Sequence, residues 1–130
     1  MNDKIVFGAA ELETLVALTD VEQERGLMFR LVPAVMSFPY EKPAIRKFWM
    51  KNTVCPLDIV FCHAGKVVDV YYGQPLSLEH VGPNIMTDLV VELPYGSAEK
   101  LGIWCGQSVK LSYSMRTLAK RYELKLKTQE

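Results

Sequence analysis

Apolar and polar residues alternate along much of the chain, and this pattern predicts a strand-rich fold. The alternation is clean in residues 108–115, where apolar residues occupy the odd positions and serine or lysine the even ones. A period of two is typical of a β-strand, because successive side chains point to opposite faces. Seven segments have a strand pattern: residues 15–18, 35–38, 57–62, 66–72, 88–93, 108–115 and 121–127.

Two short stretches carry helix signals instead. Thr19 is followed three residues later by Glu22, which is the spacing of a capping box. A helix over about residues 20–29 is therefore predicted. A second helix is predicted over residues 97–101, with Ser97 as its N-cap.

Many short strands with two short helices favour an α+β fold that is mainly β. We expect a small, barrel-like, curled sheet with antiparallel or mixed pairing, and helices that plug or cover it. The chain has 130 residues, which is the usual size of one domain, so residues 1–130 are predicted to form a single domain. Residues 116–130 are expected to form an extra C-terminal strand arm.

The charge balance argues against some classes of partner. Fifteen basic residues offset fifteen acidic ones, so no strong overall field attracts nucleic acid or an anionic membrane. Apolar runs are far shorter than the roughly 20 residues that span a bilayer. We therefore expect no nucleic acid and no membrane as partners.

Cysteine and histidine usage predicts no disulfide, no metal site and no cofactor. The three cysteines and two histidines show no recognised ligand spacing. No nucleophile elbow, phosphate-binding loop, dinucleotide fingerprint or zinc-protease motif occurs either. Whether the protein is an enzyme stays open, and the interpretation leans towards a non-enzyme.

The first chemically unusual segment is residues 24–30. On a helix, Arg25 would share one face with Val21 and Met28. A buried guanidinium is costly unless acceptors meet it. We therefore expect Arg25 to be mostly buried and paired with a carboxylate, first Asp58 and otherwise Asp88 or Glu92.

The second unusual segment, residues 47–59, places aromatic, cationic, amide and carboxylate groups close together. Trp49, Lys51 and Asn52 can orient an anionic or amide-bearing ligand, and we expect them to border the main concavity. A regular strand would point Trp49 and Asn52 to opposite faces, so a shared pocket requires a turn near Asn52-Thr53.

Together the two segments resemble the domain of unknown function 192 (DUF192) family, small single-domain proteins of bacteria, archaea and some of their viruses. The resemblance is carried by E-x-E-R-G-L-M-F-R at residues 22–30 and F-W-M-K-N-T-x-x-P-L-D-I at residues 48–59, and it extends over about residues 15–111. It implies a compact β-rich fold and brings no established reaction, cofactor or partner. Many members carry an export signal or lipid anchor, which residues 1–10 lack, so we expect a cytoplasmic location, or the host cytoplasm if a virus encodes the protein.

Three functions fit the sequence. The first is a non-catalytic module that binds a small polar ligand or a partner protein through Arg25, Trp49, Lys51, Asn52 and Asp58. The second is a small enzyme whose cleft uses Asp58 as base and Arg25 or Lys51 as electrostatic stabiliser. In the third, these residues only hold the fold together and the function lies elsewhere.

Overall fold

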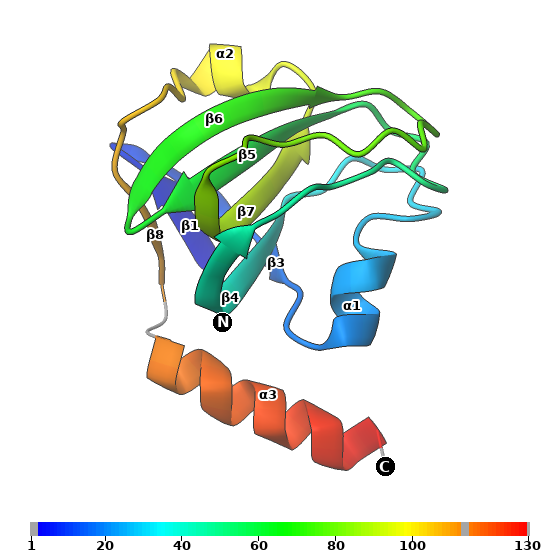
Figure 1. The fold of residues 1–130 in the computed structure, drawn as a ribbon, viewed down its shortest axis with the longest axis vertical. Coiled ribbons are helices and arrows are strands. Elements are labelled where there is room, and N and C mark those ends of the chain that lie inside the picture. Colours follow the sequence, from blue (N-terminus) through cyan, green and yellow to red (C-terminus); the bar gives the residue numbers. More distant parts are fainter. Residues whose placement is uncertain (1–2, 113–114, 130) are drawn as a thin grey trace.

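The computed structural model describes residues 3–112 and 115–129, which form two β-sheets and three helices (Figure 1). The fold is α+β and mainly β, as predicted. The strands are β1 (Lys4–Phe7), β2 (Ala10–Glu13), β3 (Leu15–Val16), β4 (Met36–Ile45), β5 (Leu57–His63), β6 (Lys66–Gly73), β7 (Met86–Pro94) and β8 (Val109–Leu111). The helices are α1 (Asp20–Arg25), α2 (Ser97–Leu101) and α3 (Met115–Gln129).

The strands form one sheet of three and one sheet of five. The smaller sheet has the order β2-β1-β8 and is antiparallel. The larger has the order β3-β4-β7-β5-β6, with β3 parallel to β4 and its other pairs antiparallel. Neither sheet closes on itself within residues 3–112 and 115–129, so the expected barrel-like curl is not supported. The strands β1 and β2 were not predicted from the sequence pattern.

The larger sheet is buried on both faces because its central strands are apolar at both odd and even positions. On β5, Val60 and Cys62 face the smaller sheet, whereas Ile59 and Phe61 face α1 and the loops around it. The first face packs against Ile5 and Phe7 of β1 and is capped by α2. The second face carries Phe38, Met50, Leu57 and Val90 and includes the site described below.

Helix α1 begins as predicted and ends earlier. The Thr19 hydroxyl accepts from the Glu22 N–H at 3.1 Å, and the Glu22 carboxylate accepts from the Thr19 N–H at 3.0 Å, which confirms the capping box. The helix stops at Arg25 because Gly26 takes a φ of +49°. The predicted extension to residue 29, with Gly26 in the helix interior, is wrong.

Helix α2 confirms the predicted residues 97–101 but not the predicted cap. Gly96, with a left-handed backbone, is the N-cap, and the Ser97 hydroxyl donates to the Pro94 carbonyl instead. The first N–H groups of the helix are satisfied by Asp58, which accepts from Gly96 at 3.1 Å and from Ala98 at 2.9 Å. A nearly buried carboxylate thus caps α2 from the neighbouring strand β5.

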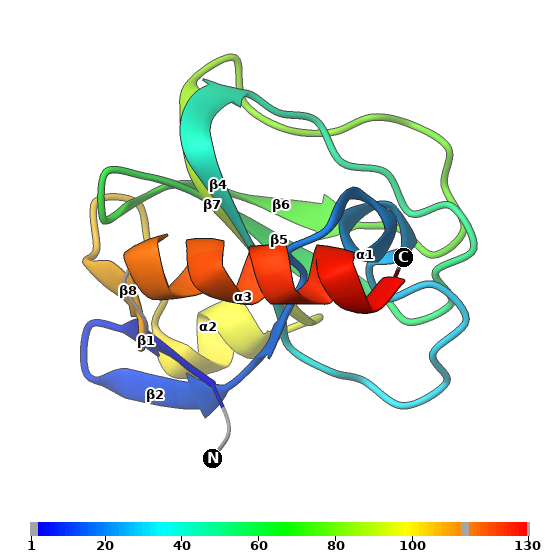
Figure 2. The same cartoon turned by 90° about the horizontal axis from the view of Figure 1, so that it is seen from below.

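The predicted strand arm at the C-terminus is wrong, because α3 occupies those residues. Helix α3 lies below the sheets in Figure 1, and in Figure 2, seen from below, it crosses in front of them with its C-terminal end near α1. Two ion pairs join it to the body: Arg121 with Asp3 at 3.0 Å, and Lys125 with Glu22 at 2.7 Å. The predicted strand 108–115 is shortened to β8, and residues 113 and 114 lie outside the described part. Among the helices of the described residues, none has the length and apolar character needed to cross a bilayer.

Candidate functional site

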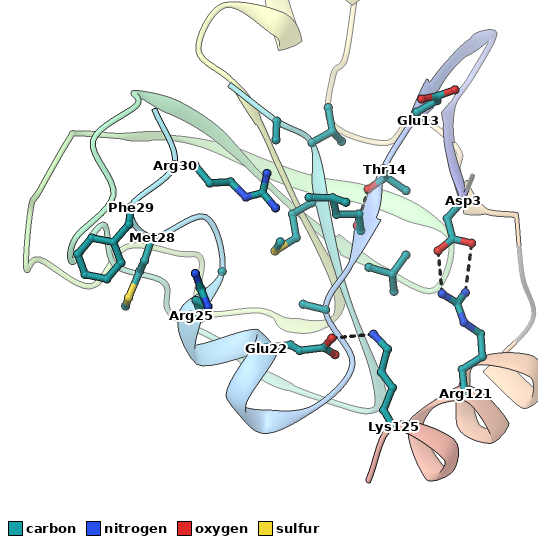
Figure 3. Close-up of a pocket in the computed structure, with 17 residues that line it drawn as sticks. Asp3, Glu13, Thr14, Glu22, Arg25, Met28, Phe29, Arg30, Arg121 and Lys125 are labelled. Atoms are coloured by element: carbon teal, nitrogen blue, oxygen red, sulfur yellow. Dashed lines mark hydrogen bonds and ion pairs between the residues drawn. The ribbon is translucent and has the colours of Figure 1, made fainter. Parts of the chain in front are cut away.

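Two concavities flank the C-terminal end of α1. The larger, here called the α3 groove, has a volume of about 980 Å³ and lies between α3, α1 and β3 (Figure 3). The smaller, here called the Glu92 pocket, has a volume of about 320 Å³ and lies on the other side of the same helix end. Arg25, Gly26 and Met28 line both.

The α3 groove is bounded by charged groups that mostly pair with one another. Figure 3 shows the Asp3–Arg121 and Glu22–Lys125 pairs along one side. Thr14 hydrogen-bonds to Ser37 at 2.8 Å, and Glu13 pairs with Lys4. Arg25 and Arg30 lie at the opposite end and are exposed. Among the residues that the structure describes, the lining of the groove contains no buried polar side chain without a partner.

The Glu92 pocket brings the two unusual sequence segments together. One wall is the end of α1 and the residues after it, and the other is the loop that follows β4. The pocket is lined by Gln23, Glu24, Arg25, Gly26, Leu27, Met28, Phe38, Tyr40, Arg46, Lys47, Phe48, Trp49, Lys51, Thr53 and Glu92.

Glu92 supplies the only buried carboxyl group of this lining. It lies on β7, opposite Met36 of β4 and Ile59 of β5, and only 4% of its surface is exposed. Within residues 3–112 and 115–129, its side chain makes no hydrogen bond and no ion pair. Burial without compensation raises the pKa of Glu92 to about 8, so the carboxyl group is largely protonated at neutral pH.

Gly26 covers this carboxyl group. A Cβ atom at Gly26 would lie 3.7 Å from Oε1 of Glu92 and 3.4 Å from Cζ of Phe38. The backbone angles of Gly26, φ 49° and ψ −127°, suit glycine rather than any residue with a side chain. The glycine thus ends α1 and lets the backbone approach Glu92 closely.

The opposite wall is built from aromatic rings. Phe48 meets Phe38 edge-to-face at 5.1 Å between centroids and Phe61 at 5.8 Å. Trp49 packs against His80 at 5.1 Å, and the Lys51 Nζ lies 5.2 Å from the centroid of the Trp49 ring. This wall offers flat apolar surface next to a cation.

A tight turn follows Trp49, but it does not bring Asn52 into the lining of the pocket, which contains Trp49, Lys51 and Thr53. The Thr53 N–H donates to the Met50 carbonyl at 3.0 Å, and Asn52 adopts a φ of +55°. Asparagine tolerates this left-handed conformation better than most residues. The Asn52 carbonyl also accepts from the Phe29 N–H at 2.8 Å, which ties the two walls together. The predicted turn near Asn52-Thr53 is therefore present.

Two of the four cations in the lining are already engaged. Arg46 lies 3.4 Å above the Tyr40 ring and donates to the carbonyls of Thr87 and Lys42. Lys47 donates to the Gly82 carbonyl and to the Asn84 side chain. The phenol of Tyr40 is held neutral, because burial raises its pKa to about 12.

The structure separates the predicted site residues into two groups. Arg25, Trp49 and Lys51 line the Glu92 pocket, and Asn52 forms the adjacent turn. Asp58 lies on the opposite face of the sheet, where it caps α2. The prediction that Arg25 is buried and paired with Asp58 is wrong, because Arg25 ends a short helix on the surface.

The expectation that Trp49, Lys51 and Asn52 border the main concavity is also wrong. The larger α3 groove does not involve Trp49, Lys51 or Asn52, which border the smaller pocket or its wall. Glu92 was considered only as a secondary partner for Arg25. The sequence does contain a signal for Glu92. It is the one charged residue in the otherwise apolar run of residues 89–93, and such a run is typical of a strand that is buried on both faces. No cluster of histidine, cysteine or acidic side chains within the described ranges has the geometry to hold a metal ion.

Comparison with known proteins places the chain in a group without an assigned activity. The family model DUF192, described as Uncharacterized ACR, matches residues 4–111. No curated protein matches the sequence.

Two solved structures share the fold. A protein of unknown function from Novosphingobium aromaticivorans has 30% sequence identity and a TM-score of 0.77, over 82% of this chain and 83% of its own. A protein from Sinorhizobium meliloti, described as a proposed transcription regulator, has 26% identity and a TM-score of 0.79, over 85% of this chain and 94% of its own. Neither description names a ligand or a reaction.

Proposed function

This chain belongs to the DUF192 family, and we propose that it is a non-catalytic module that binds one small ligand in the Glu92 pocket. The observation that carries the proposal is the carboxyl group of Glu92, which is buried without a hydrogen-bond partner at the floor of an open cavity. No group of the described residues compensates the burial of this carboxyl group, so a ligand in the pocket can supply the missing hydrogen bond.

The size and composition of the pocket also support the binding of a small ligand. Its volume of about 320 Å³ is at the lower end of the range typical of small-molecule sites. Its walls combine aromatic surface from Phe48 and Trp49 with a few polar groups, which is the usual composition of such sites. The α3 groove is larger, yet its charged groups are mostly satisfied by one another.

Nuclear magnetic resonance with a fragment library of small acids, amides and amines tests the proposal. We expect the hits to shift the backbone amide signals of Gly26, Lys51 and Thr53. The substitution Glu92→Leu should abolish these shifts while the protein stays folded. The matched control Glu99→Gln alters an exposed carboxylate on α2, on the far face of the sheet, and should leave them unchanged. If no fragment shifts the pocket signals, the two segments serve only to hold the fold together.

A small enzyme is the second candidate, with Glu92 in the role that was predicted for Asp58. An unpaired carboxyl group with a pKa near neutral pH can act as a general acid or base. Asp58 is unsuited to this role because its carboxylate is engaged by α2. The recovery of bound fragments after prolonged incubation separates the candidates. Unchanged fragments support a binding module, and conversion that Glu92→Gln abolishes supports an enzyme.

A further inference from the structure

The lining of the Glu92 pocket is richer in positive charge than the chain as a whole. It contains four basic and two acidic side chains, whereas the whole chain has fifteen of each. Besides Glu92, the titratable groups of the lining are Glu24 and Arg25 from α1, Tyr40 from β4, and Arg46, Lys47 and Lys51 from the segment after β4. Because Glu92 is largely uncharged at neutral pH, the field in the pocket favours an anion.

Two of the four cations remain available to a ligand. Within the part of the chain that the structure describes, the side chains of Arg25 and Lys51 make no hydrogen bond and no ion pair, and both are exposed. They stand on opposite walls, Arg25 at the end of α1 and Lys51 in the turn after Trp49. A guanidinium and an ammonium are both strong hydrogen-bond donors to an anionic group.

Glu92 fits an anion in its neutral form only. A protonated carboxyl group has one O–H donor, which a carboxylate accepts readily, whereas an ionised Glu92 would repel it. The aromatic groups add a second requirement. Phe38, Phe48 and Trp49 offer ring faces and edges in a small cavity, and these pack well against a flat ligand.

We propose that the ligand of the Glu92 pocket is a small, flat organic carboxylate, held by Arg25 and Lys51 and by a hydrogen bond from Glu92, with its flat part against Trp49 and Phe48. This inference rests on the proposed binding function and specifies its ligand class.

Three probes of the same shape and different charge test the ligand class: benzoate, benzamide and benzamidine. Their affinities are measured by nuclear magnetic resonance titration of the pocket amides between about pH 6 and pH 9. We expect benzoate to bind at least about tenfold more tightly than benzamidine at neutral pH, since Arg25 and Lys51 attract the carboxylate and repel the cationic amidinium. Above the pKa of Glu92, benzoate affinity should fall about tenfold per pH unit, because ionisation removes the donor.

Variants assign the effect to the named groups. Lys51→Ala and Arg25→Ala should each weaken benzoate binding several-fold. Their matched controls are Lys100→Ala on α2 and Arg30→Ala in the α3 groove. Both controls should leave benzoate affinity unchanged. Glu92→Gln keeps a donor, so it should retain benzoate binding and lose the pH dependence.

Two outcomes would overturn the inference, and they are distinct. If benzamidine binds the pocket more tightly than benzoate and gains affinity above pH 8, the site takes cations, so the inference fails and the proposed binding function stands. If none of the three probes and no fragment of the library shifts the pocket signals, the proposed function fails with it.

Discussion

Gly26 lies close to the carboxyl group of Glu92, although 66 positions separate the two residues in the sequence. The distance from a Cβ at Gly26 to Oε1 of Glu92 would be 3.7 Å. The C-terminal end of α1 therefore forms one wall of the pocket, next to the Glu92 carboxyl group on β7. This relationship joins the first motif to the central strand β7 and defines the pocket.

Gly26→Ala should destabilise the protein and weaken ligand binding. A φ of +49° with a ψ of −127° is disfavoured for alanine and costs about 1–3 kcal/mol. The added methyl group would also contact Phe38 at the pocket wall. Urea unfolding measures the first effect and benzoate titration the second.

Gly96→Ala is the matched control for this variant. Gly96 has a φ of +91°, and nothing lies within 4 Å of a Cβ built there, so its strain comes from the backbone alone. It lies at α2, remote from the pocket, and should lose stability without a loss of benzoate affinity. Equal losses of affinity in both variants would show that Gly26 acts through global stability.

Glu92 should make the protein less stable as the pH rises. The group binds its proton more tightly in the folded state, with a pKa of about 8, than in the unfolded chain, where it lies near 4.5. The stabilisation that this protonated group provides is therefore fully present below about pH 4.5 and is lost as the pH rises towards 8. At pH 7 the free energy of unfolding should be lower by about 3 kcal/mol than at pH 4.5 because of this group. Urea unfolding at a series of pH values between 4.5 and 9 measures it.

Glu92→Gln and Glu92→Leu should both remove this part of the pH dependence. Leucine also removes the unsatisfied polar group, so Glu92→Leu should be more stable than the wild type at pH 8 by several kcal/mol. Glu99→Gln, on the exposed surface of α2, should leave the profile unchanged. A wild-type profile identical to that of Glu92→Gln would show that Glu92 is ionised in the folded protein and would remove the basis for the anion site.

Asp58→Ala should cost about 2–3 kcal/mol of stability without an effect on the Glu92 pocket. The carboxylate accepts two backbone N–H groups at the start of α2, and its removal would leave both without a partner. Asp58→Asn retains one acceptor oxygen and should lose less. Thermal unfolding with benzoate titration of the same variants checks both parts. Loss of benzoate binding in a folded Asp58→Asn protein would contradict the separation of the two faces.

Local signals predicted the parts of the fold that local interactions determine. The capping box at Thr19 and Glu22 is a contact between residues three positions apart, so the sequence spacing specifies it. The hairpin of β5 and β6 likewise follows from a short turn at Ala64-Gly65. The C-terminal segment shows the limit of this approach. Tyr122, Leu124 and Leu126 alternate with charged residues, but most residues of α3 are good helix formers, and the helix prevails.

The site was harder to predict because its parts meet only through the tertiary fold. Arg25, Trp49 and Lys51 could be selected from their unusual chemistry within two motifs. Nothing in their spacing indicates that both motifs cross the face of the sheet that carries Glu92. The alternation of β5 places Asp58 on one of two buried faces, but it cannot say which face meets α1. Only the packing of α2 determines that.

Helix α3 should detach reversibly at high salt. Among its contacts with the body, the ion pairs Asp3–Arg121 and Glu22–Lys125 are partly exposed, so each contributes at most about 1 kcal/mol. Screening shortens the Debye length from about 10 Å at 0.1 M salt to about 3 Å at 1 M. Amide hydrogen exchange measured at both salt concentrations should show faster exchange in residues 115–129 at 1 M, with unchanged protection in β5 and β7. The double variant Arg121→Ala/Lys125→Ala should already exchange fast at 0.1 M. Salt-independent protection of α3 would mean that apolar contacts hold the helix, and in that case the double variant should resemble the wild type at both concentrations.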